Sequence, residues 1–467
     1  MKPVAALVVT ALLLAGGVFV SGQVQDSMIG VNVVLKTSIT KAALTELGRF
    51  GLVRDQLPEL NAVTMQARAS ELASIQALPF VASAGPDAAR TGAPVDTVPV
   101  SDFMDGLSTW DLDAVNVTDF GFDNRVVSAD GTGVYVAILD TGLLDSWRQY
   151  FPEERIAVPY ARAFGGGGGD VGFVSSQPNK WEHDQDSHGT HVTSTVLGYN
   201  LNGTPVNGVA PMATVIPVKV LNQNGSGWSS VIARGIVYVA DLKKGPLADH
   251  PVVINMSLGG GRLDPLEKAA IDYAIAAGVI IVASAGNAGT AGMGYPGAYA
   301  PVISVAASGY IGEWYPPAGG TWWYRMNVAE PTSPAQFYIA DFSSRQKGGQ
   351  DLDVAAPGTW VVGPYQNNSG QTSYYFLGGT SMASPHVAGI VALMAQQAPA
   401  LTAAQAETIL ESSAIYLAPG CRNVYSPDGT IANYCWGADA TGAGLATADA
   451  ALAGVQALTS PTPKKKK

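Results

Sequence analysis

The spacing of hydrophobic and polar residues changes near residue 86, and this change divides the chain into two folded parts. In the first part, residues 27–86, a run with strand-like alternation (Ile29–Leu35) precedes a helical stretch that Thr40 caps and Gly48 ends. Its expected elements follow the order strand, helix, strand, strand, helix, strand, at 29–35, 40–48, 51–54, 61–68, 69–78 and 80–84. That order predicts a small α+β module of the ferredoxin-like kind.

From residue 110 to residue 456 the pattern is different, because short and almost continuously apolar runs alternate with helical ones. Strands are expected at 134–139, 214–220, 252–256, 279–283 and 302–306. Helices are expected at 190–197, 229–241, 265–277, 385–397 and 402–412. Strands that are apolar on both faces and separated by helices indicate an α/β fold, with a mostly parallel sheet and helices on both of its faces.

Two segments fit neither pattern. Residues 87–109 are rich in Pro, Gly, Asp and Ser without periodicity, so we expect a linker, a kind of segment in which proteases often cut. Residues 309–341, the aromatic insertion, combine many Trp and Tyr residues with Pro and Gly. The sequence leaves three interpretations of the insertion open: a wall of a substrate cleft, a protein-docking patch, or a loop packed on itself.

The two ends of the chain carry their own signals. Residues 1–22 place one Lys before an apolar run and end in small residues, as in a secretory signal peptide. An uncleaved anchor helix is the alternative, since the run is at the lower length limit for a membrane span. No other segment is long and apolar enough to cross a bilayer. We therefore expect a protein that is secreted, extracellular or in the cell envelope, without stable membrane insertion. Residues 457–467 end in four Lys and are expected to form a disordered tail.

Composition narrows the class of protein. Charged residues make up only 13% of the chain and its net charge is −11, which argues against a nucleic-acid binder with a basic face. Two Cys exclude a disulfide scaffold and a Cys-rich metal protein. Five His leave little material for a metal site built from histidines. In an exported protein Cys421 and Cys435 fit a disulfide, which would stabilise the fold by about 3 kcal/mol for a loop of about 15 residues. Two buried free thiols are the alternative.

Three distant residues carry the chemistry of a nucleophilic enzyme. Asp140 follows the strand at 134–139, where parallel sheets place their sites, and His188 lies just before a helix. Ser381 stands in a Gly-rich turn that opens a long helix, so that its own backbone N–H can face a developing oxyanion. Hydrolysis of a peptide bond needs a hydroxyl nucleophile, an imidazole base and a carboxylate that holds the imidazole. Asn287, after the strand at 279–283, offers a second oxyanion donor.

Each residue alone has a plainer interpretation. Asp140 is equally a turn residue and His188 equally a hydrogen-bonded polar residue. Ser381 is equally a helix cap, and Asn287 equally the cap of a turn. The four together make these separate structural roles improbable.

Five stretches of the sequence resemble the subtilisin-like serine proteases, the subtilase family. They are ILDTG at 138–142, DSHGTHV at 186–192, INMSLGG at 254–260, SAGN at 284–287 and GTSMASPHVAG at 379–389. The resemblance covers about residues 110–455, and the module at 27–86 is similar to the family's inhibitory propeptide.

The resemblance implies roles for residues at matching positions. Asp140, His188 and Ser381 would form the triad, in the chain order Asp, His, Ser of this family, and Asn287 would donate to the oxyanion. An extended substrate would pair with the edge strand Ser257, Leu258 and Gly259. The pocket for the side chain before the cut would be lined by Ala283, Ser284, Ala285, Gly286 and Gly294. These small residues predict a preference for an uncharged, medium or large apolar side chain.

One departure from the family puts a calcium site in doubt. The His-Pro-Asp stretch that usually follows the catalytic Asp is replaced by Tyr150-Phe151-Pro152-Glu153. The Asn-rich loop at 198–208 could supply oxygen ligands instead, or be a plain turn-rich loop. Catalysis needs no cofactor, and a structural calcium ion stays an open expectation. His191, His386, Asp184 and Asp186 are expected to have structural roles.

The sequence thus predicts a secreted serine endopeptidase made as a self-processing zymogen. Its partners would be protein or peptide substrates and its own propeptide, which would inhibit by running its last strand through the cleft. The first cut would fall between about Gly85 and Ser108, and a monomer is expected. The alternative is a non-catalytic subtilase-like domain that binds peptides.

Overall fold

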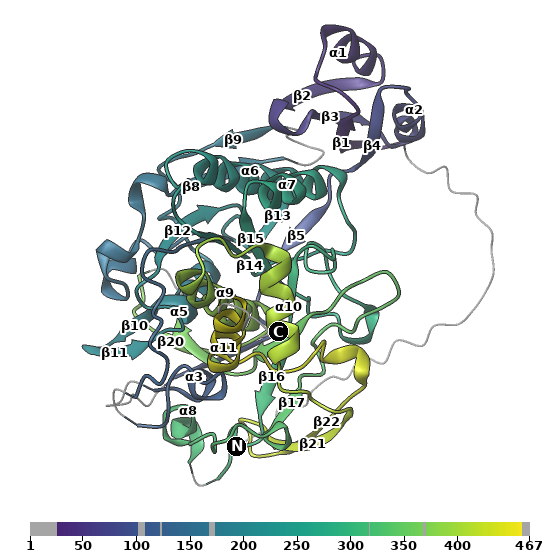
Figure 1. Cartoon of the computed structure of the whole chain (residues 1–467). Helices are drawn as coiled ribbons and strands as arrows, with labels where there is room; N and C mark the ends of the chain where they lie inside the picture. The colour runs from purple at the N-terminus through teal and green to yellow at the C-terminus, as the bar shows by residue number, and fades with distance from the viewer. Residues whose placement is uncertain are drawn as a thin grey trace, which may run out of the picture.

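The computed structural model describes residues 26–100, 108–121, 124–167, 173–316, 318–367 and 370–459. The expected signal peptide at 1–22 lies outside these residues. A small N-terminal unit sits on one side of a larger α/β body (Figure 1). None of the helices in the described ranges is long and apolar enough to cross a membrane.

The N-terminal unit contains the predicted order of strands and helices. Its elements are β1 (Met28–Leu35), α1 (Lys41–Leu47), β2 (Gly51–Leu57), β3 (Ala62–Arg68), α2 (Leu72–Gln76) and β4 (Val81–Pro86). The four strands form one antiparallel sheet in the order β2-β3-β1-β4. Val31, Val33 and Met65 are buried between this sheet and the two helices. The ferredoxin-like expectation is confirmed.

The larger body is built on a mostly parallel sheet with the order β17-β16-β15-β14-β7-β12-β8-β9, to which β18 adds beside β16. Its strands are β7 (Tyr135–Asp140), β8 (Arg162–Gly166), β9 (Val174–Ser176), β12 (Thr214–Lys219), β14 (Val252–Met256), β15 (Val279–Ser284), β16 (Ile303–Tyr310), β17 (Phe337–Ile339) and β18 (Val354–Pro357). Only β9 and β17 pair with their neighbours in antiparallel fashion. The strands at the centre are thus the five that the sequence predicted.

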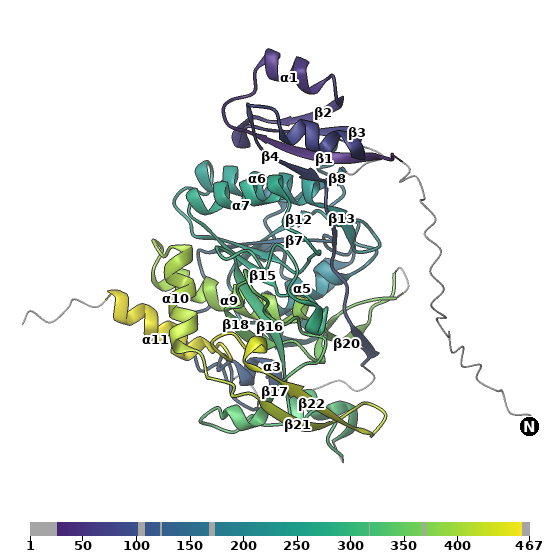
Figure 2. The ribbon, with the colours of Figure 1, turned by 90° about the vertical axis from the view of Figure 1, so that its right-hand side faces the viewer.

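Helices cover both faces of this sheet (Figure 2). The longer helices are α5 (His188–Leu197), α6 (Ser229–Lys244), α7 (Pro265–Ala276), α9 (Thr380–Gln397), α10 (Ala403–Ser413) and α11 (Ala448–Thr459), and α3 (Trp110–Ala114) and α8 (Trp322–Arg325) are short. Strand β7 shows the division, since Val136 and Ile138 join the core under α5 and α9, whereas Ala137 and Leu139 join the core under α6 and α7. The predicted α/β fold is confirmed.

The segment expected to be a linker is partly built into the larger body. Strand β5 (Ala89–Thr91) pairs with β13 (Ser226–Trp228), and β6 (Asp96–Pro99) joins β19 (Val361–Pro364) and β20 (Tyr374–Gly378) in a small sheet. The partners of these strands come from remote parts of the chain, so the sequence around the strands gives no sign of the pairing. Residues 101–107 lie outside the described part.

The aromatic insertion is mostly packed inside the protein. Trp322, Trp323 and Phe337 are fully buried. The Trp322 ring stacks on Phe376 of β20 with 6.1 Å between ring centroids, and it lies 5.7 Å from the ring of Trp110 in α3. Of the three interpretations, the structure supports a self-packed segment that also anchors α3 and β20.

Two short hairpins lie outside the main sheet. One, β10 (Gly198–Leu201) and β11 (Thr204–Asn207), is the expected turn-rich loop, and the other is β21 (Gly420–Tyr425) and β22 (Ile431–Trp436). Cys421 and Cys435 lie opposite each other in the second hairpin and form a disulfide. Helix α11 runs to Thr459, so residues 457–459, which were expected to belong to the tail, are helical, and residues 460–467 lie outside the described part.

We expect reduction of the disulfide to lower the melting temperature while leaving the active centre intact. A loop with a sequence separation of 14 residues loses about 3 kcal/mol of stabilisation when it is opened, which corresponds to several degrees. Differential scanning calorimetry of the wild type and of a Cys421→Ser/Cys435→Ser variant measures this. An unchanged melting temperature would show that the hairpin is held by Val424 and Trp436 alone, both of which are buried.

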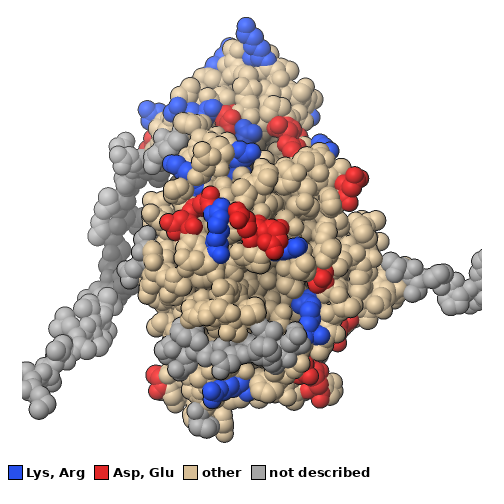
Figure 3. Space-filling model, turned by 90° about the vertical axis from the view of Figure 1, so that its left-hand side faces the viewer, with Lys and Arg blue, Asp and Glu red and all other residues tan. Residues whose placement is uncertain are grey.

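On the side drawn in Figure 3, acidic and basic side chains lie interspersed and uncharged residues cover most of the surface. This agrees with the low fraction of charged residues, 13%.

Candidate active site

Asp140 is the last residue of β7 and is completely buried. Its Oδ1 accepts a hydrogen bond from the backbone N–H of Thr141 at 2.7 Å and lies 2.8 Å from Nδ1 of His188. The hydroxyl of Thr141 in turn accepts from the backbone N–H of Gly189 at 2.8 Å, which ties the end of the strand to the helix that carries the histidine. The contact between Asp140 and Nδ1 of His188 fixes the orientation of the imidazole ring and leaves Nε2 available to take a proton.

His188 is the first residue of α5, two residues earlier than the predicted helix start. Asp184 explains the earlier start, because its carboxylate accepts from the backbone N–H of Ser187 at 2.7 Å and from the backbone N–H of Thr190 at 3.3 Å. A carboxylate at a helix N-terminus satisfies N–H groups that have no partner in the helix. Asp184 thus has the local structural role that the sequence suggested.

Two opposing effects set the pKa of His188. Burial is the largest single effect and lowers it, but the carboxylates of Asp140, Asp186 and Asp184 together raise it by more, so the pKa lies above the ordinary 6.5. Burial raises the pKa of Asp186 itself to about 6. The imidazole is therefore easier to protonate than a free one.

A pH profile follows from this shift if His188 is the base of a reaction. A base must be neutral, so kcat/KM should fall as the pH drops through the raised pKa, with the midpoint above 6.5. An Asp186→Asn variant removes one negative charge that favours the imidazolium, and we expect its midpoint to be lower. A wild-type midpoint at or below 6.5 would contradict the expectation.

Ser381 lies in the first turn of α9 and is almost fully buried. Its Oγ donates to the backbone carbonyl of Ser257 at 3.3 Å, while Nε2 of His188 has no hydrogen-bond partner within the described residues. The hydroxyl of Ser257 donates back to the carbonyl of Ser381 at 2.7 Å. Paired bonds of this kind tie the start of α9 to the end of β14.

The orientation of the Asn287 amide is set by one neighbour. Its Oδ1 accepts from the backbone N–H of Thr380 at 2.9 Å and from the hydroxyl of the same residue at 2.8 Å. With the oxygen held there, Nδ2 is left to donate elsewhere, and it lies close to Gly379 beside Ser381. The sequence pointed to Asn287 but not to Thr380. The position of Thr380 directly before Ser381 was the one available signal.

A cavity of about 550 Å³ opens beside these residues. Its lining includes Asn287, Thr380 and Ser381 and, among the predicted substrate-binding residues, Leu258, Gly259, Ser284, Gly286 and Gly294. Ala283 and Ala285 were also expected to line the pocket, but they are not among its lining residues. Their side chains are fully buried in the two hydrophobic cores. Ser284, the last residue of β15, lies between them and is among the residues that line the cavity.

An extended segment of the chain itself lies along this site. Thr91 exchanges two backbone hydrogen bonds with Gly259, of 3.0 and 2.9 Å, and the N–H of Gly92 donates to the carbonyl of Gly225 at 2.9 Å. The N–H of Val95 then donates to the carbonyl of Gly378 at 2.6 Å. We call residues 88–96 the cleft segment. The expectation that the strand at 80–84 runs through the cleft is wrong, since β4 pairs with β1 inside the N-terminal unit.

Gly92 brings the cleft segment closest to the histidine. A Cβ atom at this position would lie 3.3 Å from Cε1 of His188 and 2.7 Å from the carbonyl oxygen of Ser257. Only a residue without a side chain fits there without a shift.

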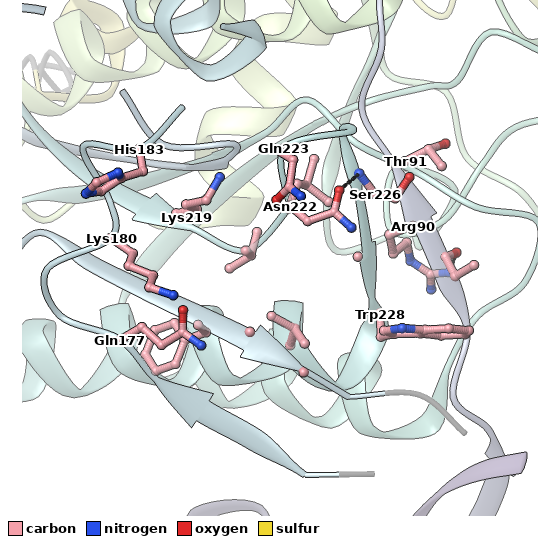
Figure 4. Close-up of a pocket in the computed structure, with 18 of the residues that line it drawn as sticks. Arg90, Thr91, Gln177, Lys180, His183, Lys219, Asn222, Gln223, Ser226 and Trp228 are labelled. Atoms are coloured by element: carbon pink, nitrogen blue, oxygen red, sulfur yellow. Dashed lines mark hydrogen bonds between the residues drawn. The ribbon is translucent and has the colours of Figure 1, made fainter. Parts of the chain in front are cut away.

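A second cavity, of about 610 Å³, adjoins the other edge of the cleft segment. Figure 4 draws Arg90 and Thr91 of β5 near Ser226 and Trp228 of β13, at one end of this cavity. Lys180, His183 and Lys219 lie at the opposite end (Figure 4).

The remaining histidines of the motifs have structural contacts. The Nε2 of His191 lies 3.1 Å from the carbonyl of Val361, and burial lowers the pKa of His191 to about 3, so it stays neutral. His386 lies 2.8 Å from the carbonyl of Met382 through Nδ1 and 3.0 Å from Asp111 through Nε2. Both agree with the structural roles expected of them.

A pair of buried polar residues behind Ser257 was not singled out by the sequence. The Asn255 side chain donates to the hydroxyl of Ser257 at 3.0 Å and accepts from Ser384 at 2.7 Å. This bridge joins β14 to the second turn of α9. An Asn inside the otherwise apolar run of residues 252–256 was the available signal, because a buried amide needs partners.

Two places could hold a cation. In the loop at 198–208, Oδ1 of Asn200 accepts from the backbone N–H of Gly203 at 2.8 Å, so it serves a plain hairpin turn. Elsewhere, carboxylate oxygens of Asp351, Asp353 and Glu407 lie within 4.8 Å of one another. Burial raises the pKa of Asp353 to about 7, which disfavours a bare cluster of three charges. Oxygen ligands of this kind suit calcium.

Comparison with known proteins agrees with the motifs. The sequence profile of the subtilase family matches residues 131–450. The thermostable alkaline protease of Halalkalibacterium halodurans is 34% identical over 287 residues, and subtilisin E of Bacillus subtilis is 35% identical over 291 residues. Each alignment covers 62% of this chain. The chain spans 63% and 62% of these two relatives, which is less than two thirds of their length.

Solved structures share the fold. Fervidolysin from Fervidobacterium pennivorans, described as a keratinolytic enzyme related to subtilisin, superimposes with a TM-score of 0.63 at 23% identity, covering 94% of this chain and 62% of fervidolysin. The S41 psychrophilic protease gives a TM-score of 0.53 at 28% identity, covering 74% of this chain and 99% of that protein. From the profile match over residues 131–450, we conclude that the chain belongs to the subtilase family.

Proposed function

We propose that this protein is a secreted serine endopeptidase that hydrolyses peptide bonds in proteins and is made as a self-processing zymogen. The observation that carries the proposal is that the cleft segment adjoins both the buried Asp140–His188 pair and the cavity that Ser381 and Asn287 line. The 2.8 Å contact between Asp140 and His188, buried beside the Ser381 helix, supports a base that is oriented in advance.

The proposed reaction uses only groups of this chain. Oγ of Ser381 attacks the substrate carbonyl while Nε2 of His188 takes the hydroxyl proton, and Asp140 stabilises the imidazolium through Nδ1. The Asn287 side chain and the backbone N–H of Ser381 donate to the oxyanion. His188 then gives its proton to the leaving amine, and water hydrolyses the acyl-enzyme by the reverse sequence. These four residues and one water molecule account for every proton moved and every charge formed, so catalysis needs no cofactor.

The cleft segment supports a zymogen. The N-terminal unit at 27–86 would act as an intramolecular inhibitor, and the segment after it blocks substrate by pairing with Gly259 and Gly225. Between the contacts of Gly92 and Val95 the chain passes Ser381, so we infer that the peptide bond from Ala93 to Pro94 is the one that faces the nucleophile. This falls within the expected range for the first cut.

The proline at position 94 gives the first cut a testable rate. Its ring places a carbon where other residues carry a hydrogen on the leaving nitrogen, which crowds the attacked carbonyl. We expect Pro94→Ala to speed the release of the N-terminal unit by tenfold or more. Gel electrophoresis of refolding full-length protein, with N-terminal sequencing of the product, measures both the rate and the bond that is cut. Equal rates would mean that cutting occurs at another bond.

Other parts of the proposal concern the protein's surroundings. The apolar start of the chain supports export, and we propose a monomer that acts on protein or peptide substrates outside the cytoplasm. We also propose that Asp351, Asp353 and Glu407 hold a structural calcium ion, in place of the loop at 198–208.

A fluorophosphonate label tests the proposed function directly. The reagent reacts only with an activated serine, so peptide mapping should find it on Ser381 of the processed protein and not on a Ser381→Ala variant. Folded, processed protein that takes no label would favour the alternative, a non-catalytic domain that binds peptides.

We expect Asn287→Ala to lower kcat by about 10²- to 10³-fold with little change in KM, because the amide acts on the oxyanion and not on bound substrate. This magnitude comes from subtilisin itself and is not deduced from the geometry. Steady-state kinetics with a peptide substrate measures it, and Thr380→Val serves as a matched control that loosens the amide without removing it. A loss confined to KM would contradict the role.

A further inference from the structure

An ion pair with no exposed atoms joins the cleft segment to α7. Nε of Arg90 donates to Oε1 of Glu267 at 3.0 Å, and Nη2 of Arg90 contacts Oε2, so the guanidinium and the carboxylate meet in a two-point contact. Both side chains are fully buried. Nη2 also donates to the backbone carbonyl of Arg262 at 3.0 Å, and Nη1 to that of Ala89 at 3.0 Å. Planar two-point pairing of this kind is particular to arginine.

The pocket is shaped for a long side chain that comes from the cleft. A Cβ atom at Gly260 would lie 2.7 Å from Nη1 of Arg90 and 2.3 Å from the carbonyl oxygen of Ala89. The glycine therefore leaves open the path along which the side chain passes. Glu267 stands in the first turn of α7, where its N–H is capped by Asp264 at 3.1 Å.

The charges around the guanidinium are negative. Besides Glu267, Asp264 and Asp87 act on Arg90, and all three raise its pKa. Asp264 is engaged with the start of α7, and Asp87 with the hydroxyls of Ser229 and Ser230. Of these three carboxylates, Glu267 is therefore the one whose described hydrogen-bond partner outside α7 is Arg90 of the cleft segment.

Arg90 occupies a defined place relative to the reacting bond. The cleft segment is paired on both sides, with β13 through Arg90 opposite Gly227 and with Gly259 through Thr91. Since Ala93 supplies the carbonyl inferred to face Ser381, Arg90 is the third residue before it. A substrate that pairs with the same edges would place its own third residue before the attacked carbonyl over Glu267.

Release of the cleft segment changes the state of Glu267. The carboxylate then loses its guanidinium partner in a site built to exclude water. A substrate arginine restores the two-point pair, whereas an uncharged side chain of the same length leaves the carboxylate without its counter-charge.

We propose that Glu267 is a specificity-determining residue that selects substrates with arginine three residues before the residue whose carbonyl is attacked. This rests on the proposed endopeptidase function and adds to it a preference for a positively charged side chain at one substrate position. The apolar preference predicted for the residue at the cut concerns a different pocket and stands beside it.

Two matched peptides test the proposal with processed protein that has released its N-terminal unit and the cleft segment. They are fluorogenic and identical except that one has arginine and the other citrulline at the third residue before the residue whose carbonyl is attacked. Citrulline keeps the shape and lacks the charge. We expect kcat/KM to be about 10- to 100-fold higher for the arginine peptide, as for a lost hydrogen-bonded charge pair. Equal cleavage of the two peptides overturns the proposal.

Variants assign the preference to one carboxylate. Glu267→Gln should reduce the ratio to near one, while Asp272→Asn, which removes an exposed carboxylate of the same helix, should leave it unchanged. A ratio that survives in Glu267→Gln overturns the assignment. If that variant does not fold, the ratio in the wild type decides. If neither peptide is cut and no fluorophosphonate is bound, the proposed endopeptidase function itself is wrong. If both peptides are cut equally, the endopeptidase function stands and only the proposed specificity is wrong.

Discussion

Ser381→Ala should abolish hydrolysis of peptide substrates and leave the chain uncut, still carrying residues 27–86. Oγ of Ser381 is the nucleophile that forms the acyl-enzyme in the proposed reaction, and neither His188 nor Asn287 can replace it. In subtilisin itself, loss of the serine costs about 10⁶ in kcat, and we expect a loss of this order here. Mass spectrometry of the purified variant and kinetics with a fluorogenic peptide measure the two effects.

The control for this variant is its fold. The hydroxyl of Ser381 makes one 3.3 Å hydrogen bond, to the carbonyl of Ser257, so its removal should change the melting temperature little. Processing of purified Ser381→Ala at the wild-type rate would mean that another molecule makes the cut. Retained hydrolysis by the folded variant would contradict the triad.

Arg90→Leu should destabilise the full-length chain by about 3–5 kcal/mol, because it leaves the buried carboxylate of Glu267 without its partner. The measurement is urea unfolding in the Ser381→Ala background, where the chain is not cut. The double variant Arg90→Leu/Glu267→Leu removes both charges, and we expect it to recover most of the lost free energy of unfolding.

An exposed ion pair on the same helix provides the comparison. Lys268 and Asp272 lie 2.7 Å apart with both side chains more than two-fifths exposed. Removing that pair should change the free energy of unfolding by about 1 kcal/mol or less, since exposed pairs are screened by water. An equally small effect of Arg90→Leu would show that water reaches Glu267 and that the pair does little to hold the cleft segment.

The fold and the residues proposed to react could be named from the sequence because local patterns mark them. Asp140 ends an apolar run and Ser381 opens a helical one, so strand and helix boundaries alone set both side chains at one end of the sheet. Ser284 and its neighbours show the limit of this reasoning. The pattern marks 279–283 as a strand, but it does not show that Ala283 and Ala285 enter the two cores while Ser284 lines the cavity.

The cleft segment could not be predicted in the same way. Residues 88–96 pair with Gly225, Gly259 and Gly378, which are far away in the sequence, and β5 has only three residues, which is too short for an alternation of side chains to be recognised. Arg90 and Glu267 each look like ordinary solvent-facing charges in the sequence. Only the closing of the cleft segment on α7 removes both from water. The aromatic insertion is similar, since its burial depends on Trp110 and Phe376.

The central claim is that Asp140, His188 and Ser381 form one catalytic unit once the cleft segment leaves. With the segment in place, Oγ of Ser381 donates to Ser257 and Nε2 of His188 has no partner within the described residues. The most direct measurement is a crystal structure of the processed protein without residues 27–93. The account predicts Oγ of Ser381 within about 3.2 Å of Nε2 of His188, with the Asp140 contact kept. An imidazole that stays beyond hydrogen-bond reach of the hydroxyl, in protein that is folded and free of the segment, would contradict it.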